Sequence, residues 1–326
     1  MAASEDVAFQ VLSDVHADMH AGATAASDTL PAHVLHALRP SPSADVLCLA
    51  GDVAEVCSPQ YTEVLRWVSE RYTHVAVVLG NHEGYSMQWE DAVQGAQDAA
   101  EDLSNVHILH RDVWEVPGAC GVTVMGATGW TVPPCLSWGG QDSRFIKDYA
   151  ASAEQWALDD AAFLAAAADA AVSKGRTPVA LTHFPPTQLP GDVRRYGARD
   201  PVPCLLATCT ACSREPSGWR AAKRRATAQY FYHGSTRVDE CSAGCCSGGA
   251  ADAQACPLHP SKAQCTVDAA MRGVLCTVPL WMCGHTHAAS DAVPSPGAAR
   301  VVSNPLGYPN EQEVHHVIGL SVSIPV

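Results

Sequence analysis

The chain has 326 residues, of which 47% are hydrophobic and 17% charged, a composition typical of a folded globular protein rather than a disordered one. Its formal net charge of −14 argues against general nucleic-acid binding and against an anionic membrane surface, because both need basic side chains to meet phosphates. The N-terminal residues contain no long apolar run, and no later stretch approaches the roughly 18 apolar residues of a membrane span. We therefore expect a cytoplasmic protein without a membrane segment.

Short apolar segments rich in Val, Leu and Ile recur along the chain, and each of them ends in polar residues. They are VAFQVLS before Asp14, DVLCLA before Gly51 and Asp52, HVAVVL before Gly80 and Asn81, TPVALT before His183, and PLWMC before Gly284 and His285. Near-continuous apolar runs of this length predict strands that are buried on both faces. Residues 121–125, 300–303 and 316–324 are expected to add further strands and so a second sheet.

Helical patterns lie between these strands, and the clearest runs from Ser152 to Lys174. Ser152 and Gln155 have the spacing of a capping box, and Gly175 can serve as the C-terminal cap. Strands that alternate with helices predict a layered α/β architecture, in which ligands collect beyond the carboxyl ends of the strands. We expect one domain over residues 1–326.

The segment at about 189–271 breaks the pattern, because it is rich in Cys, Arg, Pro and Gly and has little apolar periodicity. We interpret it as an insertion within the single domain. Ten of the chain's 14 cysteines lie between Cys204 and Cys283, and Cys209 and Cys212 have the spacing of a zinc knuckle. Cys241 and either Cys245 or Cys246 could complete a structural zinc site. The alternative that we favour is an inserted loop with adventitious thiols, since a second CxxC is missing.

Five polar clusters follow the predicted strands in order: DVH at Asp14, GD at Asp52, GNHE at Asn81, a single His183, and GHTH at His285. Any one of them alone is more often a turn or a capping group than a metal ligand. Chance agreement of all five, each at the end of a predicted strand, is improbable. Carboxylates, imidazoles and an amide oxygen together suit Mn, Fe, Zn or Ni better than Ca.

The series from Asp14 to His287 resembles the calcineurin-like metallophosphoesterase superfamily. Two further stretches, at 126–131 and 303–309, resemble a bacterial-type branch of phosphoesterases whose substrates are poorly defined. The resemblance implies a four-layer αββα sandwich of two mixed β-sheets flanked by helices, with two divalent metal ions. It implies a hydrolase that cleaves phosphomonoester or phosphodiester bonds of a small substrate by a metal-activated hydroxide.

Position by position, the resemblance assigns a ligand role to seven residues and an acid role to one. The first ion is assigned Asp14, His16 and His287, the second ion Asn81, His183 and His285, Asp52 bridges the two, and His82 is the general acid. His82 follows a ligand directly, so it can reach a leaving-group oxygen without binding metal. Glu55 is considered as an orienting partner of His82, and Arg144 and Lys147 as groups for a substrate phosphate, although all three are equally consistent with solvated side chains.

One departure narrows the class of enzyme. Serine/threonine protein phosphatases of this superfamily resemble GDxxDRG at the second motif, whereas residues 51–57 read GDVAEVC and lack the phosphate-gripping arginine. Two alternatives stay open: a phosphodiesterase or pyrophosphatase directed at nucleotides, and a non-catalytic metal-binding scaffold that docks an unknown protein through the Cys-rich insertion. Substitution of His82 separates the last from an enzyme.

Overall fold

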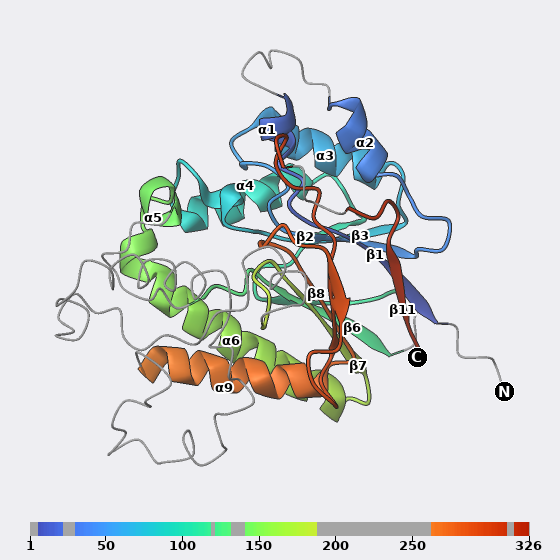
Figure 1. Ribbon diagram of the computed structural model, residues 1–326, viewed down its shortest axis with the longest axis vertical. Helices are drawn as coiled ribbons and strands as arrows, with labels where there is room; N and C mark the ends of the chain where they lie inside the picture. Colours follow the sequence, from blue (N-terminus) through green and yellow to red (C-terminus); the bar gives the residue numbers. More distant parts are fainter. Residues whose placement is uncertain are drawn as a thin grey trace.

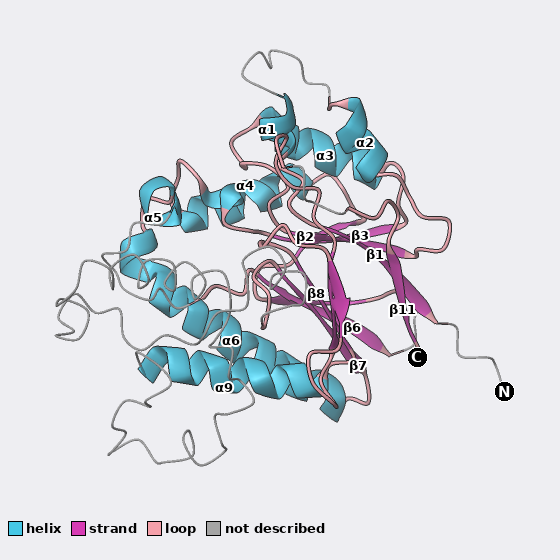
Figure 2. Ribbon diagram, viewed as in Figure 1, coloured by secondary structure: helices cyan, strands magenta, loops and turns pink. Residues whose placement is uncertain are grey.

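The computed structural model describes residues 6–21, 30–118, 121–131, 141–187, 262–311 and 316–325. Two β-sheets lie face to face in the middle of the molecule, with helices on both outer sides (Figures 1 and 2). The helices α1 to α4 cover the first sheet, and α6 and α9 cover the second. This is the four-layer α/β sandwich that the sequence predicted.

The elements follow one another in this order along the chain. The strands are β1 (Val7–Leu12), β2 (Val46–Ala50), β3 (His74–Val78), β4 (Val106–Ile108), β5 (Asp112–Glu115), β6 (Val122–Ala127), β7 (Thr177–Thr182), β8 (Leu280–Cys283), β9 (Ser290–Ala292), β10 (Arg300–Ser303) and β11 (Ser321–Ile324). The helices are α1 (Ala17–Ala21), α2 (Ala32–Ala37), α3 (Pro59–Ser69), a 3₁₀ turn at His82–Gly84, α4 (Trp89–Ala100), α5 (Gln141–Phe145), α6 (Tyr149–Ser173) and α9 (Lys262–Thr277).

Both sheets are mixed. The first has the order β11-β1-β2-β3-β4, in which β11 runs antiparallel to β1 and the remaining pairs are parallel. The second has the order β5-β6-β7-β8-β10-β9, with antiparallel pairing at both edges. The parallel strands β1, β2, β3, β7 and β8 carry the five predicted polar clusters at their carboxyl ends, so the topology gathers these clusters at one edge of the sandwich.

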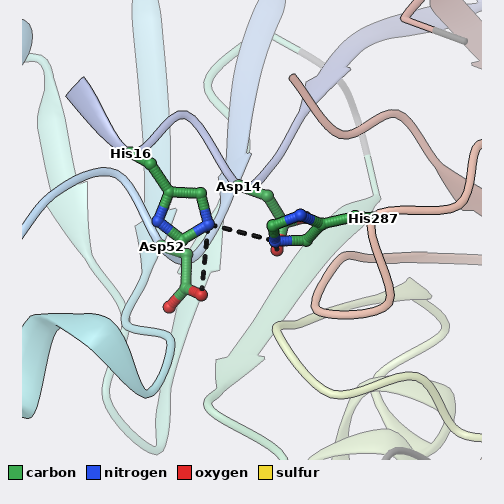
Figure 3. A group of neighbouring side chains, drawn as sticks. All are labelled: Asp14, His16, Asp52 and His287. Atoms are coloured by element: carbon green, nitrogen blue, oxygen red, sulfur yellow. Dashed lines mark hydrogen bonds and ion pairs between the residues drawn. The ribbon is translucent and has the colours of Figure 1, made fainter. Parts of the chain in front are cut away.

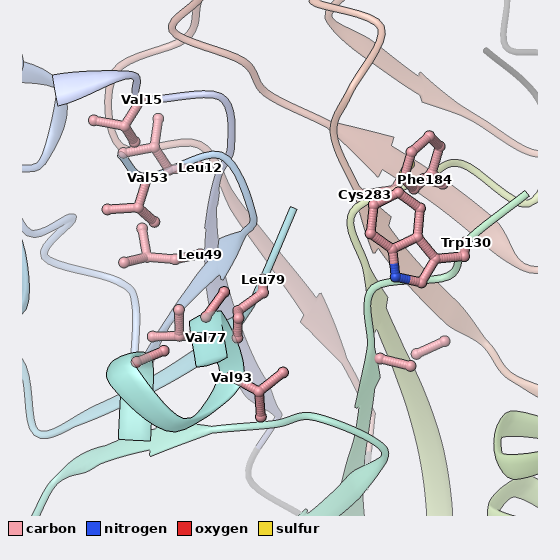
Figure 4. Close-up of a cluster of buried hydrophobic side chains, with 14 of the residues drawn as sticks. Leu12, Val15, Leu49, Val53, Val77, Leu79, Val93, Trp130, Phe184 and Cys283 are labelled. Carbon is pink, nitrogen blue, oxygen red and sulfur yellow. The ribbon is translucent and has the colours of Figure 1, made fainter. Parts of the chain in front are cut away.

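Alternation along the strands divides the apolar residues between two clusters. On β1, Val7, Phe9 and Val11 point between the sheets, whereas Leu12 packs with residues under the helices. The inter-sheet cluster continues through alternate residues of β2, β3, β7 and β8. The larger cluster joins the sheets to the helices, and Figure 4 draws part of it, including Leu79 and Trp130.

Most predicted strands form, and two predicted boundaries are corrected. Helix α6 begins at Tyr149 rather than Ser152, because Tyr149 is buried against Trp130 and Trp156 and so anchors an earlier first turn. Of the run at 316–324, only Ser321–Ile324 forms a strand. Gly175 ends α6 in the left-handed conformation, with φ +67°, as expected of a C-terminal cap.

The predicted insertion falls mostly on residues 188–261, which lie outside the described part of the chain. Its last residues, from Lys262 onward, belong to α9, which packs against α6. Val267, Met271 and Val274 are buried in that contact. The boundaries of the insertion and the single-domain organisation therefore stay predictions, as does a zinc site at Cys209, Cys212 and Cys241 with Cys245 or Cys246.

Candidate metal centre

The backbone at the predicted ligands adopts an unusual conformation. Five residues of the candidate centre have positive φ: Asp14 (51°), His16 (43°), Asp52 (53°), His285 (71°) and His287 (51°). Side chains other than glycine rarely adopt this region, and each such residue costs of order 1–3 kcal/mol. Backbone hydrogen bonds from Asp14 N–H to Gly51 O and from His16 N–H to Asp52 O hold the first two turns together. Strain concentrated at one set of polar side chains indicates a functional site.

Two glycines let these turns approach each other closely. A Cβ on Gly51, whose φ is +79°, would lie 2.6 Å from Nδ1 of His183. A Cβ on Gly284 would lie 2.6 Å from the Cβ of Ser13 and 2.7 Å from Oδ2 of Asp14. The glycine at the start of the GD and GHTH motifs is thus required by the contact of neighbouring turns and not only by the local bend.

The first group consists of Asp14, His16, Asp52 and His287, all buried, whose ligand atoms lie within 4.8 Å of one another (Figure 3). The Nε2 atoms of His16 and His287 are 3.0 Å apart. Asp14 Oδ1 lies 3.3 Å from Nε2 of His287, and Asp52 Oδ2 lies 3.7 Å from Nε2 of His16. On the far side of the His287 ring, Nδ1 contacts the Glu311 carboxylate at 2.5 Å.

The second group consists of Asp52, His183 and His285, again with ligand atoms within 4.8 Å. Asn81 joins it, because its Oδ1 lies 3.0 Å from Nε2 of His183 and 3.2 Å from Nδ1 of His285. Asp52 Oδ2 is 3.4 Å from Nε2 of His183. Nδ1 of His183 faces the Ala50 carbonyl at 2.9 Å, which directs Nε2 into the group. The structure thus brings together all seven residues that were predicted as ligands.

The buried carboxylate in each ligand group stabilises positive charge on a neighbouring imidazole. Burial lowers the pKa of His16 and of His285 well below the usual range, so both imidazoles are neutral. Burial acts in the same direction on His287 and His183, but the adjacent carboxylates of Asp14 and Asp52 raise their pKa values to about 9 and about 10. Each group therefore pairs a carboxylate with an imidazole whose positively charged form that carboxylate stabilises.

A divalent cation fits this charge distribution. The carboxylates of Asp14 and Asp52 stay ionised although burial alone would raise their pKa, because the neighbouring histidines lower it. A metal ion would take over the balancing charge from the protons and would use the imidazole lone pairs that face the centre. The residues present thus fit divalent metal binding.

His82 borders both groups without belonging to either. Its backbone N–H donates to Asp52 Oδ1 at 2.9 Å, and its side chain is 12% exposed. Nε2 lies 3.1 Å from the Tyr308 hydroxyl. The Tyr308 ring also packs against His16 and His287, with ring centroids 4.4 Å from each. A partly exposed imidazole beside the ligands, held by a tyrosine, is where a proton donor to substrate is expected.

The expected contact of His82 with Glu55 does not form among the described residues. The Glu55 carboxylate instead accepts a weak hydrogen bond from the Cys57 thiol at 3.5 Å. Arg144 and Lys147 are exposed on and after α5, and the guanidinium of Arg144 lies 5.6 Å from the centroid of the Phe145 ring. The structure therefore leaves both basic residues as surface side chains.

Four residues with structural consequences for the centre were not identified from the sequence: Glu83, Asp142, Tyr308 and Glu311. Glu83 is fully buried and accepts backbone N–H groups of Asp52, Val53 and Gly80 at 2.7–3.0 Å. It thereby fastens the second motif to the third. Its position inside the GNHE motif was the available signal. Tyr308 lies in the 303–309 stretch, whose family resemblance does not by itself indicate a role for the tyrosine.

The comparisons agree with this geometry. The family model described as calcineurin-like phosphoesterase matches residues 9–206, which is more than half of the chain. The chain belongs to the calcineurin-like phosphoesterase family. As a member of that family it is a metal-dependent phosphoric ester hydrolase, and the buried Asp and His groups are consistent with the metal requirement. None of the curated proteins matches the chain by sequence.

One solved structure shares the fold over nearly its whole length. The Phosphopantetheinyl Hydrolase from Mycobacterium tuberculosis superimposes with a TM-score of 0.54 at 14% identity, over 98% of this chain and 96% of that one. TT1561 of Thermus thermophilus covers 56% of this chain and 70% of its own, with a TM-score of 0.38 and 15% identity. The first similarity supports the phosphoesterase fold. Within the described residues, no helix has the length and apolar character needed to cross a membrane.

Proposed function

We propose that this phosphoesterase hydrolyses phosphomonoester or phosphodiester bonds at a centre of two divalent ions. The observation that carries the proposal is a shared carboxylate, since Asp52 belongs to both ligand groups. Asp14, His16 and His287 would hold one ion, and Asn81, His183 and His285 the other, with Asp52 between them. This mixture of carboxylate, imidazole and amide donors suits Mn, Fe, Zn or Ni.

Two bound ions would lower the pKa of a water nucleophile and offset charge on the entering and leaving oxygens at phosphorus. The residues of the chain have separate tasks. His82 donates a proton from Nε2 to the leaving-group oxygen; in the structure this atom lies 3.1 Å from the Tyr308 hydroxyl, and the leaving-group oxygen replaces that contact when substrate binds. The backbone N–H of His82 bonds to Asp52, so the proton donor is fixed relative to the residue that both groups share.

The test is hydrolysis of aryl phosphate monoesters and diesters by protein that has been stripped of metal and reconstituted with Mn²⁺. Because one solved structure with the same fold is a phosphopantetheinyl hydrolase, a phosphopantetheinyl ester belongs among the diesters. Asp52→Asn is expected to lose both turnover and bound metal. His82→Ala is expected to keep its metal and to lose about 10²- to 10⁴-fold in kcat. The exposed His36 supplies the control, His36→Ala, which should behave as wild type.

The leaving group sharpens this test. A proton donor matters most when the departing oxygen is basic, so His82→Ala should lose far more with phenyl than with 4-nitrophenyl esters. Equal losses with both esters would remove His82 from the acid role. Mn²⁺ binding without turnover of any ester would instead favour the non-catalytic scaffold, and partner capture through residues 189–271 would then be tested.

A further inference from the structure

A buried carboxylate lies directly behind the Asn81 side chain. Asp142, on the short helix α5, accepts a hydrogen bond from Nδ2 of Asn81 at 2.8 Å through its Oδ1 atom. The same oxygen accepts a hydrogen bond from the Tyr85 hydroxyl at 2.9 Å. Nδ2 of Asn81 also donates to the Tyr85 oxygen at 3.1 Å. All three side chains are buried, so these contacts are shielded from competing water.

The directions of these bonds fix which face of the Asn81 amide points at the candidate centre. A carboxylate such as Asp142 only accepts, and the Tyr85 hydroxyl gives its single proton to Asp142, so both positions require the amide NH₂. The amide oxygen must then face His183 and His285, where it lies 3.0 and 3.2 Å from their ring nitrogens. An oxygen is the ligand a cation needs there, and the reversed amide would present two N–H donors instead.

The first group has an equivalent support on its opposite side. The Glu311 carboxylate contacts Nδ1 of His287 and also accepts the backbone N–H of Tyr308 at 2.9 Å. With its proton held at Nδ1, the His287 ring directs Nε2 toward Asp14 and His16. Asp142 and Glu311 thus act on different ligands, and neither belongs to the two ligand groups themselves.

We propose that Asp142 and Glu311 are separate positioning residues, Asp142 for the second ion through Asn81 and Glu311 for the first ion through His287. The inference rests on the two-ion centre of the proposed function. It adds that the two ions depend on different outer carboxylates, so that the affinity of each can be weakened alone. Outer partners of this kind are worth about 10- to 100-fold in metal affinity.

The experiment is a calorimetric titration of the metal-free full chain with Mn²⁺, with elemental analysis of the bound metal. Wild type is expected to bind two ions. Asp142→Ala and Glu311→Ala should each weaken one binding event by about 10- to 100-fold and leave the other unchanged. Asp142→Asn keeps an acceptor oxygen toward Asn81 and should recover part of the loss. Asp148→Asn is the matched control, because the Asp148 side chain bonds only to the backbone N–H of Trp89 among the contacts described.

Double variants show which ion each carboxylate serves. In a His287→Ala background, Glu311→Ala should have no further effect on Mn²⁺ binding, whereas Asp142→Ala should still weaken the remaining event. In an Asn81→Ala background, Asp142→Ala should have no further effect on Mn²⁺ binding, whereas Glu311→Ala should still weaken the remaining event. These cycles separate positioning from general loss of structure, which would weaken binding in either background.

The two proposals fail in different ways. Fewer than two ions on the wild-type protein would overturn the two-ion function. Two ions on wild type, with unchanged affinities in Asp142→Ala and Glu311→Ala, would overturn the positioning roles and leave the function standing. Equal effects of both substitutions in both backgrounds would likewise overturn the assignment of one carboxylate to each ion.

Discussion

The same strands contribute to two very different regions: an apolar layer between the sheets and a polar centre at their carboxyl ends. In the layer, Phe9 and its neighbours are fully buried, and their removal from water stabilises the fold. Just beyond the end of β1, Asp14 and His16 are equally buried, yet both side chains are polar, Asp14 is ionised, and both residues have left-handed backbone. Burial therefore stabilises the fold in the middle of the strand, where the side chains are apolar, and costs free energy just beyond its end, where they are polar.

The apolar layer between the sheets and the polar centre at the strand ends are expected to contribute separately to stability and to activity. Apolar contacts between the sheets stabilise the fold, and this stabilisation offsets the cost of strained backbone and buried polar side chains at the strand ends. Substitutions in the layer should then change stability and spare turnover, while substitutions at the centre should do the reverse. Three variants outside the ligand set put this division to the test.

The largest effect on stability is expected from Phe9→Ala. Phe9 has no exposed surface and lies between the sheets on β1, so truncation should lower the free energy of unfolding by about 3–5 kcal/mol. Urea unfolding measures the loss, and kcat per folded molecule should stay at the wild-type value. Val172→Ala on α6, where the side chain is 52% exposed, should shift stability by less than about 0.5 kcal/mol. A fall in the kcat of Phe9→Ala with unchanged stability would contradict the claim that this layer contributes to stability and not to turnover.

A smaller loss of stability, together with loss of turnover, is expected from Glu83→Gln. One side-chain oxygen can still serve Asp52 and Gly80, but the new amide NH₂ would face the Val53 N–H, leaving a buried donor unsatisfied. The cost should be about 1–3 kcal/mol, and the shift of the two turns should weaken Mn²⁺ binding. Thermal unfolding and metal titration measure the two effects. Glu101 is exposed, so Glu101→Gln serves as the control. Wild-type metal affinity in Glu83→Gln would show that the Glu83 hydrogen bonds do not fix the position of the two turns.

The smallest effect is expected at the edge of the second sheet, from Asp291→Asn. Asp291 on β9 makes a bidentate pair with Arg300 on β10 at 2.7 Å, but both side chains are more than 40% exposed. Solvent screening limits the loss to less than about 1 kcal/mol. The Arg300 contact lowers the pKa of Asp291, so its contribution is present above the unfolded pKa and disappears as pH falls through the folded value. Unfolding curves of both proteins should therefore converge in acid, and a gap that persists there would contradict an ion-pair origin.

The meeting of the seven predicted ligands in space could be predicted from the sequence, because each of them follows a recognisable apolar strand. Parallel strands place such turns at one edge, so local pattern and topology together predict their meeting. Asp142 and Glu311 had no such signal: Asp142 lies 61 residues from Asn81 on a five-residue helix, and Glu311 lies in a turn. Their roles depend on tertiary contacts that no short period encodes.

Helix α9 has a pattern that composition alone did not indicate. Residues 262–271 fall within the predicted Cys-rich insertion, and Val267, Met271, Val274 and Val278 recur at spacings of four, three and four. That spacing is the signature of one helical face, and it packs on α6. Composition over a long window concealed a local pattern that was present.

The turn around Asp14 also has a consequence for biosynthesis. Its carboxylate accepts the backbone N–H of His285, 271 residues later, and its carbonyl accepts that of Gly307. Contacts between such distant positions form late, because the intervening chain must be ordered first. A nascent chain that has emerged just past β7 already carries Asp14, Asp52, Asn81 and His183 but lacks the partners that close either ligand group. Metal loading is therefore expected to follow synthesis rather than accompany it.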